Sequence, residues 1–285
     1  MAAPFTAACI QLTSGPEPAE NIAQVSQLIR EAKASGADLI LTPETTDMMQ
    51  PRRRLAFETA RDESAHEALA ALRALAAELE VWLLIGSLVV RLAEERLANR
   101  SFLIGPDGAL AARYDKIHMF DVEIPDGQSY RESKAYRPGE SAVLCDLPWG
   151  RIGLTVCYDL RFPSLYRDLA NAGADFLTVP SAFTRFTGAA HWHVLLRARA
   201  IETGCFVFAP AQCGDHVGGR ETYGHSLIVA PWGEILADGG KEPGFITARI
   251  DPAEVAKARG MVPSLGHDRP YRLATPATDL RQAGE

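Results

Sequence analysis

The sequence predicts an α/β fold, in which strands and helices alternate along the chain. Two stretches carry this prediction. Residues 5–12 form an apolar strand, residues 22–32 place apolar side chains on one face of a helix that ends at Gly36, and residues 38–42 form a second strand. Residues 152–156 form a buried strand that a helix follows. Because strand–helix–strand units join parallel strands, we expect parallel pairing in part of the sheet structure.

The remaining elements continue this alternation. Ser64 and Glu67 have the spacing of a capping box, which predicts a helix that extends to Leu79. Further strands are expected at residues 82–90, 101–104, 110–114, 176–181, 205–211, 223–231, 235–237 and 245–250, and a further helix at residues 191–203. The polar segment 121–140 contains two prolines and two glycines, and we expect a long ordered loop that covers a site.

Size and composition limit the classes of function. With 285 residues, of which 47% are hydrophobic and 23% charged, the chain can bury a large core. We expect one domain at residues 1–260 and a C-terminal arm at residues 261–285. A net charge of −7, with no basic run longer than residues 52–54, argues against nucleic acid and membranes as partners and favours a small molecule.

Two features predict a cytoplasmic protein. The segment MAAPFTAACIQL lacks the basic and long apolar regions of a signal peptide, and no apolar run reaches the length of a membrane span. The five cysteines are odd in number and form no C-x-x-C pair, which fits a reducing compartment better than a disulfide framework.

Cys157 is the first candidate catalytic residue. It stands at the carboxyl end of the strand 152–156 and shortly before a helix that starts at Pro163. Open α/β sheets place their ligand crevice at such a junction, and backbone N–H groups there can face an anion. A thiol at this position is suited to nucleophilic attack. The alternative is a buried structural cysteine, which is the commoner fate of an isolated cysteine.

Glu44 and Lys116 also stand just after predicted strands. Glu44 follows Pro43 at the end of the strand 38–42, and Lys116 follows the strand 110–114. Each has an ordinary explanation when taken alone, since a solvated loop glutamate and a lysine that extends into water are both common. Taken together with Cys157, the three side chains indicate convergence in one crevice.

The joint pattern resembles the carbon–nitrogen hydrolase (nitrilase) superfamily. The resemblance rests on PE at residues 43–44, DKIHMF at 115–120 and GLTVCYDLRFPSLYR at 153–167, and it extends from about residue 5 to about residue 252. It implies a catalytic triad of Glu44, Lys116 and Cys157. We expect an αββα sandwich, with two mixed sheets facing each other and helices outside.

The resemblance also implies a homodimer or a higher homo-oligomer. Two subunits would pack their helix layers into a four-layer αββααββα structure, through the helices after Cys157 and around residues 190–203. No cofactor and no metal are implied, and no G-x-G-x-x-G, Walker or paired metal motif occurs.

Within the superfamily, the chain is most similar to the branch of deaminated glutathione amidase and omega-amidase, with a preference for the former. Segments at residues 116–125, 131–133, 182–184, 187–192, 195–203, 211–213 and 223–226 carry this similarity. His193 departs from it, because an acidic residue is expected there. The alternatives within this chemistry are hydrolysis of α-ketoglutaramate and hydrolysis of N-carbamoyl amino acids.

Such a site implies a hydrolase that cleaves the amide of a small carboxylic acid and releases ammonia. Cys157 attacks the amide carbon and forms a thioester, while Glu44 acts as the base towards the thiol and then towards water. Lys116 keeps Glu44 ionised and, with the backbone N–H of Tyr158, stabilises the oxyanion.

A fourth residue is implied on the loop 121–140. By resemblance, Glu132 orients the substrate or the triad lysine. Glu123 on the same loop is the alternative.

A substrate that bears a carboxylate needs a positive or N–H-rich pocket. The candidates by position are Tyr158, Arg161, Phe183, Thr184 and Thr187. For Arg161 the alternative is an ion pair with Asp159 or with a carboxylate at a dimer contact.

Two other classes of function stay open. A Cys–His hydrolase would pair Cys157 with His118, His191 or His225, which leaves the acid and the lysine at the strand ends without a role. A non-catalytic binding protein would keep the fold and form no covalent adduct. A metal site from His191 and His193 is not expected, because residues two apart on a helix point apart.

Overall fold

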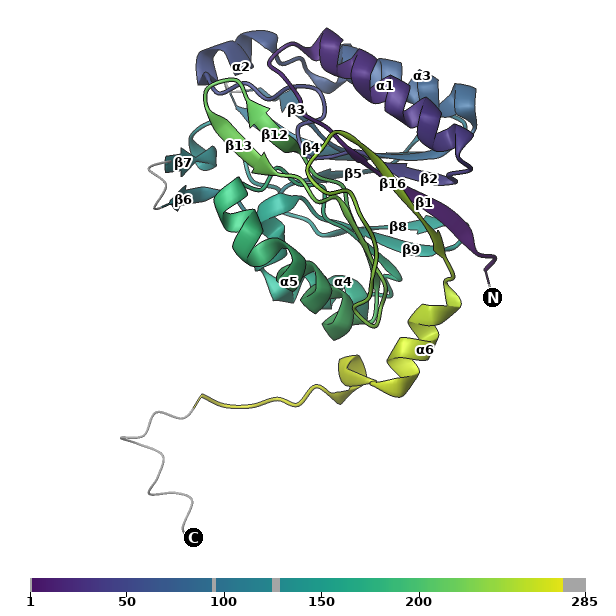
Figure 1. The fold of residues 1–285 in the computed structure, drawn as a ribbon. Helices are drawn as coiled ribbons and strands as arrows, with labels where there is room; N and C mark the ends of the chain where they lie inside the picture. The colour runs from purple at the N-terminus through teal and green to yellow at the C-terminus, as the bar shows by residue number, and fades with distance from the viewer. Residues whose placement is uncertain (1, 94–95, 125–128, 274–285) are drawn as a thin grey trace.

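Two six-stranded mixed sheets face each other, and helices cover their outer faces (Figure 1). The computed structural model describes residues 2–93, 96–124 and 129–273. This arrangement confirms the predicted sandwich of two mixed sheets between helices. Its doubling into four layers by a second subunit stays a prediction.

The first sheet has the strand order β16-β1-β2-β3-β4-β5. Strands β1, β2 and β3 are parallel, and the outer pairs are antiparallel. Helix α1 (Pro18–Ala34) joins β1 to β2, which confirms the βαβ unit expected at the start of the chain. The strands are β1 Phe5–Gln11, β2 Leu39–Leu41, β3 Trp82–Arg91, β4 Leu97–Ile104, β5 Leu110–Asp115 and β16 Gly244–Ile250.

The second sheet has the order β15-β14-β11-β10-β9-β8, with β9, β10 and β11 parallel. Its strands are β8 Val143–Leu147, β9 Gly150–Leu154, β10 Phe176–Thr178, β11 Phe206–Ala209, β14 Leu227–Val229 and β15 Ile235–Asp238. Two short antiparallel pairs lie at one end of the sandwich (Figure 1): β6 Asp121–Glu123 with β7 Ser129–Arg131, and β12 Cys213–His216 with β13 Arg220–Tyr223.

The helices cover both sheets. Helices α1 and α3 (Glu67–Leu79) lie on the first sheet, and α4 (Pro163–Asn171) and α5 (Arg185–Thr203) lie on the second (Figure 1). The other helical segments are α2 Arg53–Thr59, α6 Ala253–Met261, η1 Glu63–Ala65, η2 Glu132–Lys134, η3 Cys157–Arg161 and η4 Ser264–His267. Within the described ranges, no helix has both the length and the apolarity that a membrane crossing requires.

Alternate side chains of the strands enter two different cores. In β2, Leu39 and Leu41 face the second sheet and pack in one cluster with residues such as Leu154, whereas Ile40 packs in a second cluster with Leu72 of α3. Both faces of the strand are therefore buried. This explains why its sequence is a continuous apolar run rather than an alternating one.

Gly86 allows the two sheets to approach each other next to Glu44. A Cβ atom at this position of β3 would lie 2.0 Å from the Thr42 carbonyl oxygen, 2.4 Å from that of Pro43 and 2.5 Å from the Pro180 Cβ. A side chain there would displace the segment that carries Glu44, so the close approach requires glycine.

Helix α5 begins six residues earlier than the sequence predicts. Its N-cap is Thr184, whose Oγ1 accepts a hydrogen bond from the Thr187 N–H at 3.2 Å. Gly188 suggests a loop in the sequence, but here it makes room for Tyr223, whose Cβ would lie 2.3 Å from an added Cβ. Contact between α5 and β13 therefore overrides the low helix propensity of glycine.

Other boundaries also differ from the predictions. The predicted strand 223–231 is interrupted at Gly224 and His225, which have φ values of 73° and 54°. The expected capping box is wrong: the carboxylate of Asp62 caps the short turn η1 by accepting from the Ala65 N–H, and α3 begins without a side-chain cap. Strands β8 and β12 and helices α2 and α6 were not expected. Of the predicted loop and arm, residues 125–128 and 274–285 lie outside the described residues.

Candidate active site

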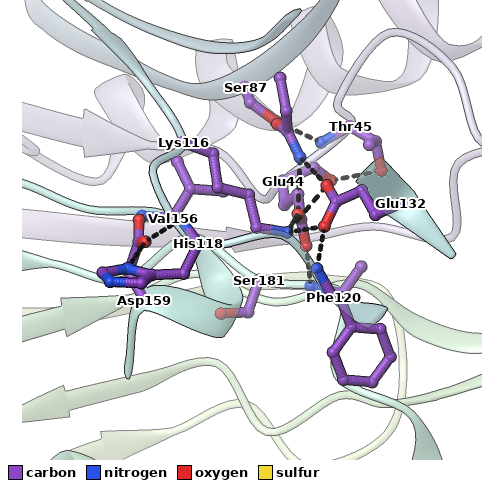
Figure 2. Close-up of polar contacts among 12 residues, drawn as sticks. Glu44, Thr45, Ser87, Lys116, His118, Phe120, Glu132, Val156, Asp159 and Ser181 are labelled. Carbon is purple, nitrogen blue, oxygen red and sulfur yellow. Dashed lines mark hydrogen bonds and ion pairs between the residues drawn. The ribbon is translucent and has the colours of Figure 1, made fainter. Parts of the chain in front are cut away.

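Four side chains singled out in the sequence line one cavity. Glu44 follows β2, Lys116 directly follows β5, and Cys157 begins η3 shortly after β9. Glu132 begins η2, in the segment that was expected to cover a site. Figure 2 shows Glu44, Lys116 and Glu132 pointing towards one another.

Lys116 lies at the centre of this cluster, with its side chain 2% exposed. Its Nζ donates to Glu44 Oε1 at 3.0 Å and to Glu132 Oε2 at 2.8 Å. Burial lowers the pKa of Lys116, but the charges of Glu132 and Glu44 outweigh burial and hold that pKa well above its ordinary value. The amine is therefore a fixed positive charge between two carboxylates.

The Glu44 carboxylate is buried and receives hydrogen bonds on both oxygens. Asn99 Nδ2 donates to Oε1 at 2.8 Å, and the Ala182 backbone N–H donates to Oε2 at 2.9 Å. Asn99 Nδ2 also lies 3.2 Å from Glu132 Oε1, so one amide group serves both carboxylates. These donors stabilise the charged form of both acids in a site with little water.

The Cys157 thiol lies beside the Glu44 carboxylate, to which it can donate a hydrogen bond. Burial and the Glu44 charge raise the pKa of Cys157, and the opposing charge of Lys116 does not restore it. Burial also raises the pKa of Glu44, but the charge of Lys116, the thiol and the charge of Arg220 together lower it below its ordinary value. The resting pair near neutral pH is therefore a thiol beside a carboxylate.

The backbone at Cys157 is held in an unusual conformation. Its φ of 52° lies in the left-handed region, which costs a residue with a side chain about 1–3 kcal/mol. The Cys157 N–H donates to the Pro180 carbonyl at 2.9 Å, a contact between the turn after β9 and the segment after β10. The turn places the sulfur at the end of the strand and in contact with the cavity.

Asp159 connects the segment after Lys116 to the segment after Cys157. Its carboxylate is fully buried. It accepts hydrogen bonds from the His118 N–H at 3.0 Å, His118 Nδ1 at 2.7 Å and the Val156 N–H at 2.9 Å (Figure 2). The Tyr114 hydroxyl also donates to it, at 2.7 Å. The carboxylate thus fixes the lysine and the cysteine relative to each other.

Glu132, and not Glu123, contacts Lys116. Glu132 Oε2 also accepts from the Phe120 N–H at 2.6 Å (Figure 2). The side chain of Glu123 is 76% exposed and pairs with Arg131 instead. The structure therefore brings the first of the two candidates into the cluster and leaves the second at the surface.

The three histidines of the rival Cys–His arrangement each have another partner. His118 Nδ1 contacts Asp159, His191 Nδ1 lies 3.3 Å from the Arg161 guanidinium, and His225 Nδ1 lies 2.9 Å from Asp238. The charged side chains that act on the thiol are Glu44 and Lys116, and the Ala182 backbone also contacts it. This geometry favours a carboxylate, and not an imidazole, as the base.

The cavity has a volume of about 600 Å³, and the charged residues of its lining are mostly basic. Of the substrate-binding candidates, Arg161, Phe183 and Thr187 line it, whereas Tyr158 and Thr184 are not among the lining residues. Thr184 caps α5, and the Tyr158 ring packs edge-on against Phe120 and Phe162. Further cationic residues along the lining are Arg53, Arg131, Lys134 and Arg220.

Arg161 does not form the expected ion pair with Asp159 anywhere in the described part of the chain. Its guanidinium lies 5.5 Å from the centre of the Phe183 ring and 6.0 Å from that of Tyr158. The arginine is therefore held by aromatic rings beside the cavity, and no acid among the described residues forms an ion pair with it.

The carbon–nitrogen hydrolase family model matches residues 6–260. The chain belongs to this family. A deaminated glutathione amidase from Synechocystis sp. is 43% identical over 272 residues, which cover 93% of this chain and 98% of that protein. The superfamily resemblance seen in the sequence is thus confirmed, and the protein is a hydrolase that acts on carbon–nitrogen bonds other than peptide bonds.

Two solved structures show the same fold. The NitFhit protein of C. elegans superposes with a TM-score of 0.89 at 36% identity. The match covers 94% of this chain and 66% of the longer NitFhit chain, so this chain spans just under two thirds of that protein. An amidase mutant from Nesterenkonia sp. AN1, with the acetamide moiety of fluoroacetamide added covalently at its active-site cysteine, gives a TM-score of 0.77 at 27% identity, over 89% and 92% of the two chains.

Sequence reasoning missed three residues of this carbon–nitrogen hydrolase site. Asn99 had a visible signal, because an asparagine inside the apolar strand Leu97–Ile104 needs a polar partner. Asp159 stood two residues after the nucleophile but was considered only as a partner of Arg161. Arg220 had no signal, since it reaches the cavity from the hairpin β12–β13, far along the chain.

Replacing Lys116 by alanine tests the electrostatic arrangement. We expect kcat/KM to fall roughly 10²–10³-fold, the loss typical of an oxyanion-stabilising group. The acid limb of the pH–rate profile should move to higher pH, because the pKa of Glu44 rises when the neighbouring positive charge is lost. The measurement is kcat/KM against pH, with Lys257→Ala on α6 as an exposed control.

The rival arrangement makes the opposite prediction. A mild effect of Lys116→Ala, together with a several-thousandfold loss in His118→Asn, His191→Asn or His225→Asn, would show that an imidazole and not Glu44 is the base. Circular dichroism of each variant separates loss of chemistry from loss of fold.

Proposed function

We propose that the protein is a deaminated glutathione amidase in which Cys157 is the nucleophile and Glu44 the general base. The observation that carries the proposal is the buried amine of Lys116, which contacts the carboxylates of Glu44 and Glu132 beside the Cys157 thiol. The relative named for this activity, at 43% identity over nearly the whole chain, supports the substrate class.

In the first half of the reaction, the Cys157 sulfur attacks the amide carbon while its proton moves to Glu44. The carbonyl oxygen becomes an oxyanion, which the charge of Lys116 and the backbone N–H of Tyr158 stabilise. The protonated Glu44 then gives its proton to the amide nitrogen. The carbon–nitrogen bond breaks, the amine leaves, and a thioester remains on the cysteine.

In the second half, Glu44 takes a proton from a water molecule, whose oxygen attacks the thioester carbon. The carbon–sulfur bond breaks, and Glu44 returns the proton to the sulfur. The carboxylic acid is released and the site is restored. Glu132 keeps Lys116 in position through this cycle, since both of its carboxylate oxygens accept hydrogen bonds from the amine.

The amine that leaves depends on the substrate. A primary amide such as α-ketoglutaramate releases ammonia. In deaminated glutathione the amide joins a five-carbon oxo acid to cysteinylglycine, so the leaving group is this dipeptide, which carries a primary amine that the substrate lacks. This difference provides a direct assay.

The lining of the cavity supports a substrate with carboxylates. The charge of Lys116 is matched by Glu44 and Glu132, whereas Arg53, Arg131, Lys134, Arg161 and Arg220 add positive charge around them. Deaminated glutathione carries a carboxylate at each end, and guanidinium groups bind carboxylates through paired hydrogen bonds. The cavity volume of about 600 Å³ also accommodates a tripeptide-sized molecule.

A substrate panel tests the proposed function. We expect the highest kcat/KM for deaminated glutathione, at least roughly tenfold above α-ketoglutaramate, and no turnover of N-carbamoyl amino acids or a simple nitrile. A fluorogenic amine reagent measures cysteinylglycine, and an ammonia assay covers the other substrates. Cys157→Ala is the control and should be inactive.

The outcomes of the panel are distinct. Preference for the carbamoyl compounds or the nitrile would overturn the substrate class and keep the cysteine chemistry. Absence of turnover on every compound by folded protein would overturn the amidase proposal itself.

Arg220 is proposed as a carboxylate-binding residue of this cavity. Its Nη2 donates to the Ala182 carbonyl at 2.6 Å, and its guanidinium lies 5.4 Å from the centre of the Tyr130 ring. Its buried Nε–H donates to no hydrogen-bond acceptor within the described residues. These contacts hold a positive charge close enough to Glu44 to lower the pKa of that acid.

Arg220→Ala should therefore raise KM for α-ketoglutaramate by roughly 10–100-fold, the cost of a lost charged hydrogen bond. The KM for pentanamide, a neutral amide of similar length, should change far less. Arg54→Ala on α2, an exposed arginine next to the cavity residue Arg53, is the matched control. An equal rise in KM for both amides would contradict direct recognition of the carboxylate.

We also propose that the chain forms the homodimer expected from its sequence. The apolar side chains Val194 and Ile201 of α5 and Trp232 in the turn after β14 are 67%, 54% and 51% exposed, which supports burial of this face against a second copy. Sedimentation velocity should give twice the chain mass of 30.9 kDa. Val194→Asp should give monomers. Val217→Asp, an exposed position on the hairpin β12–β13, should leave the dimer intact. A monomeric wild-type protein would contradict the proposal.

The domain division and the location stay predictions. The family match ends at residue 260, which supports a domain at residues 1–260 followed by an arm at residues 261–285. The cytoplasmic location rests on the sequence features given above.

A further inference from the structure

His193, His225 and Asp238 form a second cluster of metal-ligating side chains. They come from α5, from the link between β13 and β14, and from the end of β15. His193 Nε2 lies 3.1 Å from Asp238 Oδ2, and His225 Nδ1 lies 2.9 Å from Asp238 Oδ1. One ligand atom from each residue lies within 4.8 Å of the other two.

The spacing of these atoms is close to that of a tetrahedral metal site. Zn²⁺ binds nitrogen and oxygen ligands at about 2.0–2.2 Å, which places neighbouring ligand atoms roughly 3.4 Å apart. The two contacts, 3.1 Å to Asp238 Oδ2 and 2.9 Å to Asp238 Oδ1, are slightly shorter than this value, so a bound ion would replace the hydrogen bonds between these groups. Two imidazoles and one carboxylate are also a ligand set that zinc sites use, with the fourth position open to water.

Surrounding contacts hold the backbone of His225 and the side chain of Asp238. His225 has a φ of 54°, its N–H donates to the Gly240 carbonyl at 2.6 Å, and its carbonyl accepts from the Trp192 indole N–H at 2.7 Å. The last contact joins the residue before His193 to His225, so both histidines are held in register. The Gly240 N–H donates to Asp238 Oδ1 at 2.9 Å. Orienting contacts of this kind are typical of metal ligands.

The cluster lies outside the catalytic cavity. None of its three residues is among the residues that line that cavity. Their side chains are 30%, 19% and 35% exposed for His193, His225 and Asp238, so an ion can reach them from solvent. The His225 ring also stacks on Tyr223 at a centre-to-centre distance of 4.5 Å, which orients its nitrogens.

We propose that His193, His225 and Asp238 bind one divalent transition metal ion, with Zn²⁺ as the preferred ion, in an accessory site. The bound ion would join α5 to the β14–β15 hairpin, and α5 carries Thr187 at the cavity. The proposal revises the expectation of a protein without metal. The sequence analysis considered His193 only together with His191, whereas the other two proposed ligands are 32 and 45 positions away along the chain.

Calorimetric titration of Zn²⁺ tests the proposal, using the full chain treated with a chelator and then dialysed. All proteins carry Cys157→Ala, so that the active-site thiol does not bind zinc. We expect one Zn²⁺ per chain, and an affinity at least roughly 100-fold lower in His193→Asn and in Asp238→Asn. His267→Asn, an exposed histidine of η4, is the matched control and should bind as the parent does.

Two further readouts identify the ligands. Zn²⁺ should raise the Tm of the parent protein and of His267→Asn but not of His193→Asn, because only a protein with all ligands gains stability from the ion. Co²⁺ in place of Zn²⁺ should give visible absorption without the near-ultraviolet band of a thiolate ligand. Absence of saturable binding by the parent, binding by the two ligand variants as tight as that of the parent, or a thiolate band would overturn the proposal.

Discussion

The buried contact of Lys116 with Glu44 and Glu132 is the constraint on which the site depends. Two carboxylates and one amine are held almost out of water, so each charge is stable only while its partners stay in place. Removal of one partner from such a buried group typically costs about 3–5 kcal/mol. Asn99 adds a donor to each acid from the strand next to β5. The segments that carry Glu44, Asn99, Lys116 and Glu132 are therefore held together by the same charges that the proposed mechanism uses.

Cys157, the proposed nucleophile, comes from the other sheet, and separate contacts bring it to this cluster. Residues 180–182, which follow β10, form the link: the Pro180 carbonyl accepts from the Cys157 N–H, and the Ala182 N–H donates to Glu44. The absence of a side chain at Gly86 lets this segment approach the end of β2. Asp159 adds a second link, because it binds the backbone and the ring of His118, two residues after Lys116. Two independent sets of hydrogen bonds, through residues 180–182 and through Asp159, therefore fix the position of the Cys157 sulfur relative to the charged cluster.

The sequence predicted the parts of this site that depend on local pattern. Glu44, Lys116 and Cys157 each follow an apolar strand, and strand ends converge in an α/β fold, so their meeting in one cavity could be expected. The resemblance favoured Glu132 over Glu123, but the residue pattern itself could not choose between them. Both lie on one polar segment, and only the path of the chain through η2 decides which carboxylate reaches the lysine. Asp159 and Arg220 were missed for the same reason: their roles come from partners more than 30 residues away. The early start of α5 depends on the fit of Gly188 to Tyr223, which no local pattern contains.

The resting protonation states explain how one acid can serve a cycle of several proton transfers. The pKa of the Cys157 thiol is raised and that of Glu44 is lowered, so the proton stays on sulfur until an electrophile is present. When the carbon–sulfur bond forms as the proton leaves, no free thiolate has to exist in this buried site. The proton can then move to Glu44 without leaving a negatively charged sulfur beside the acid. The same lowered pKa makes protonated Glu44 a strong acid towards the departing amine. In the proposed mechanism, the carboxylate held beside a fixed ammonium acts as base and acid in turn, because its proton affinity is low in the resting site and its neighbours change charge during the reaction.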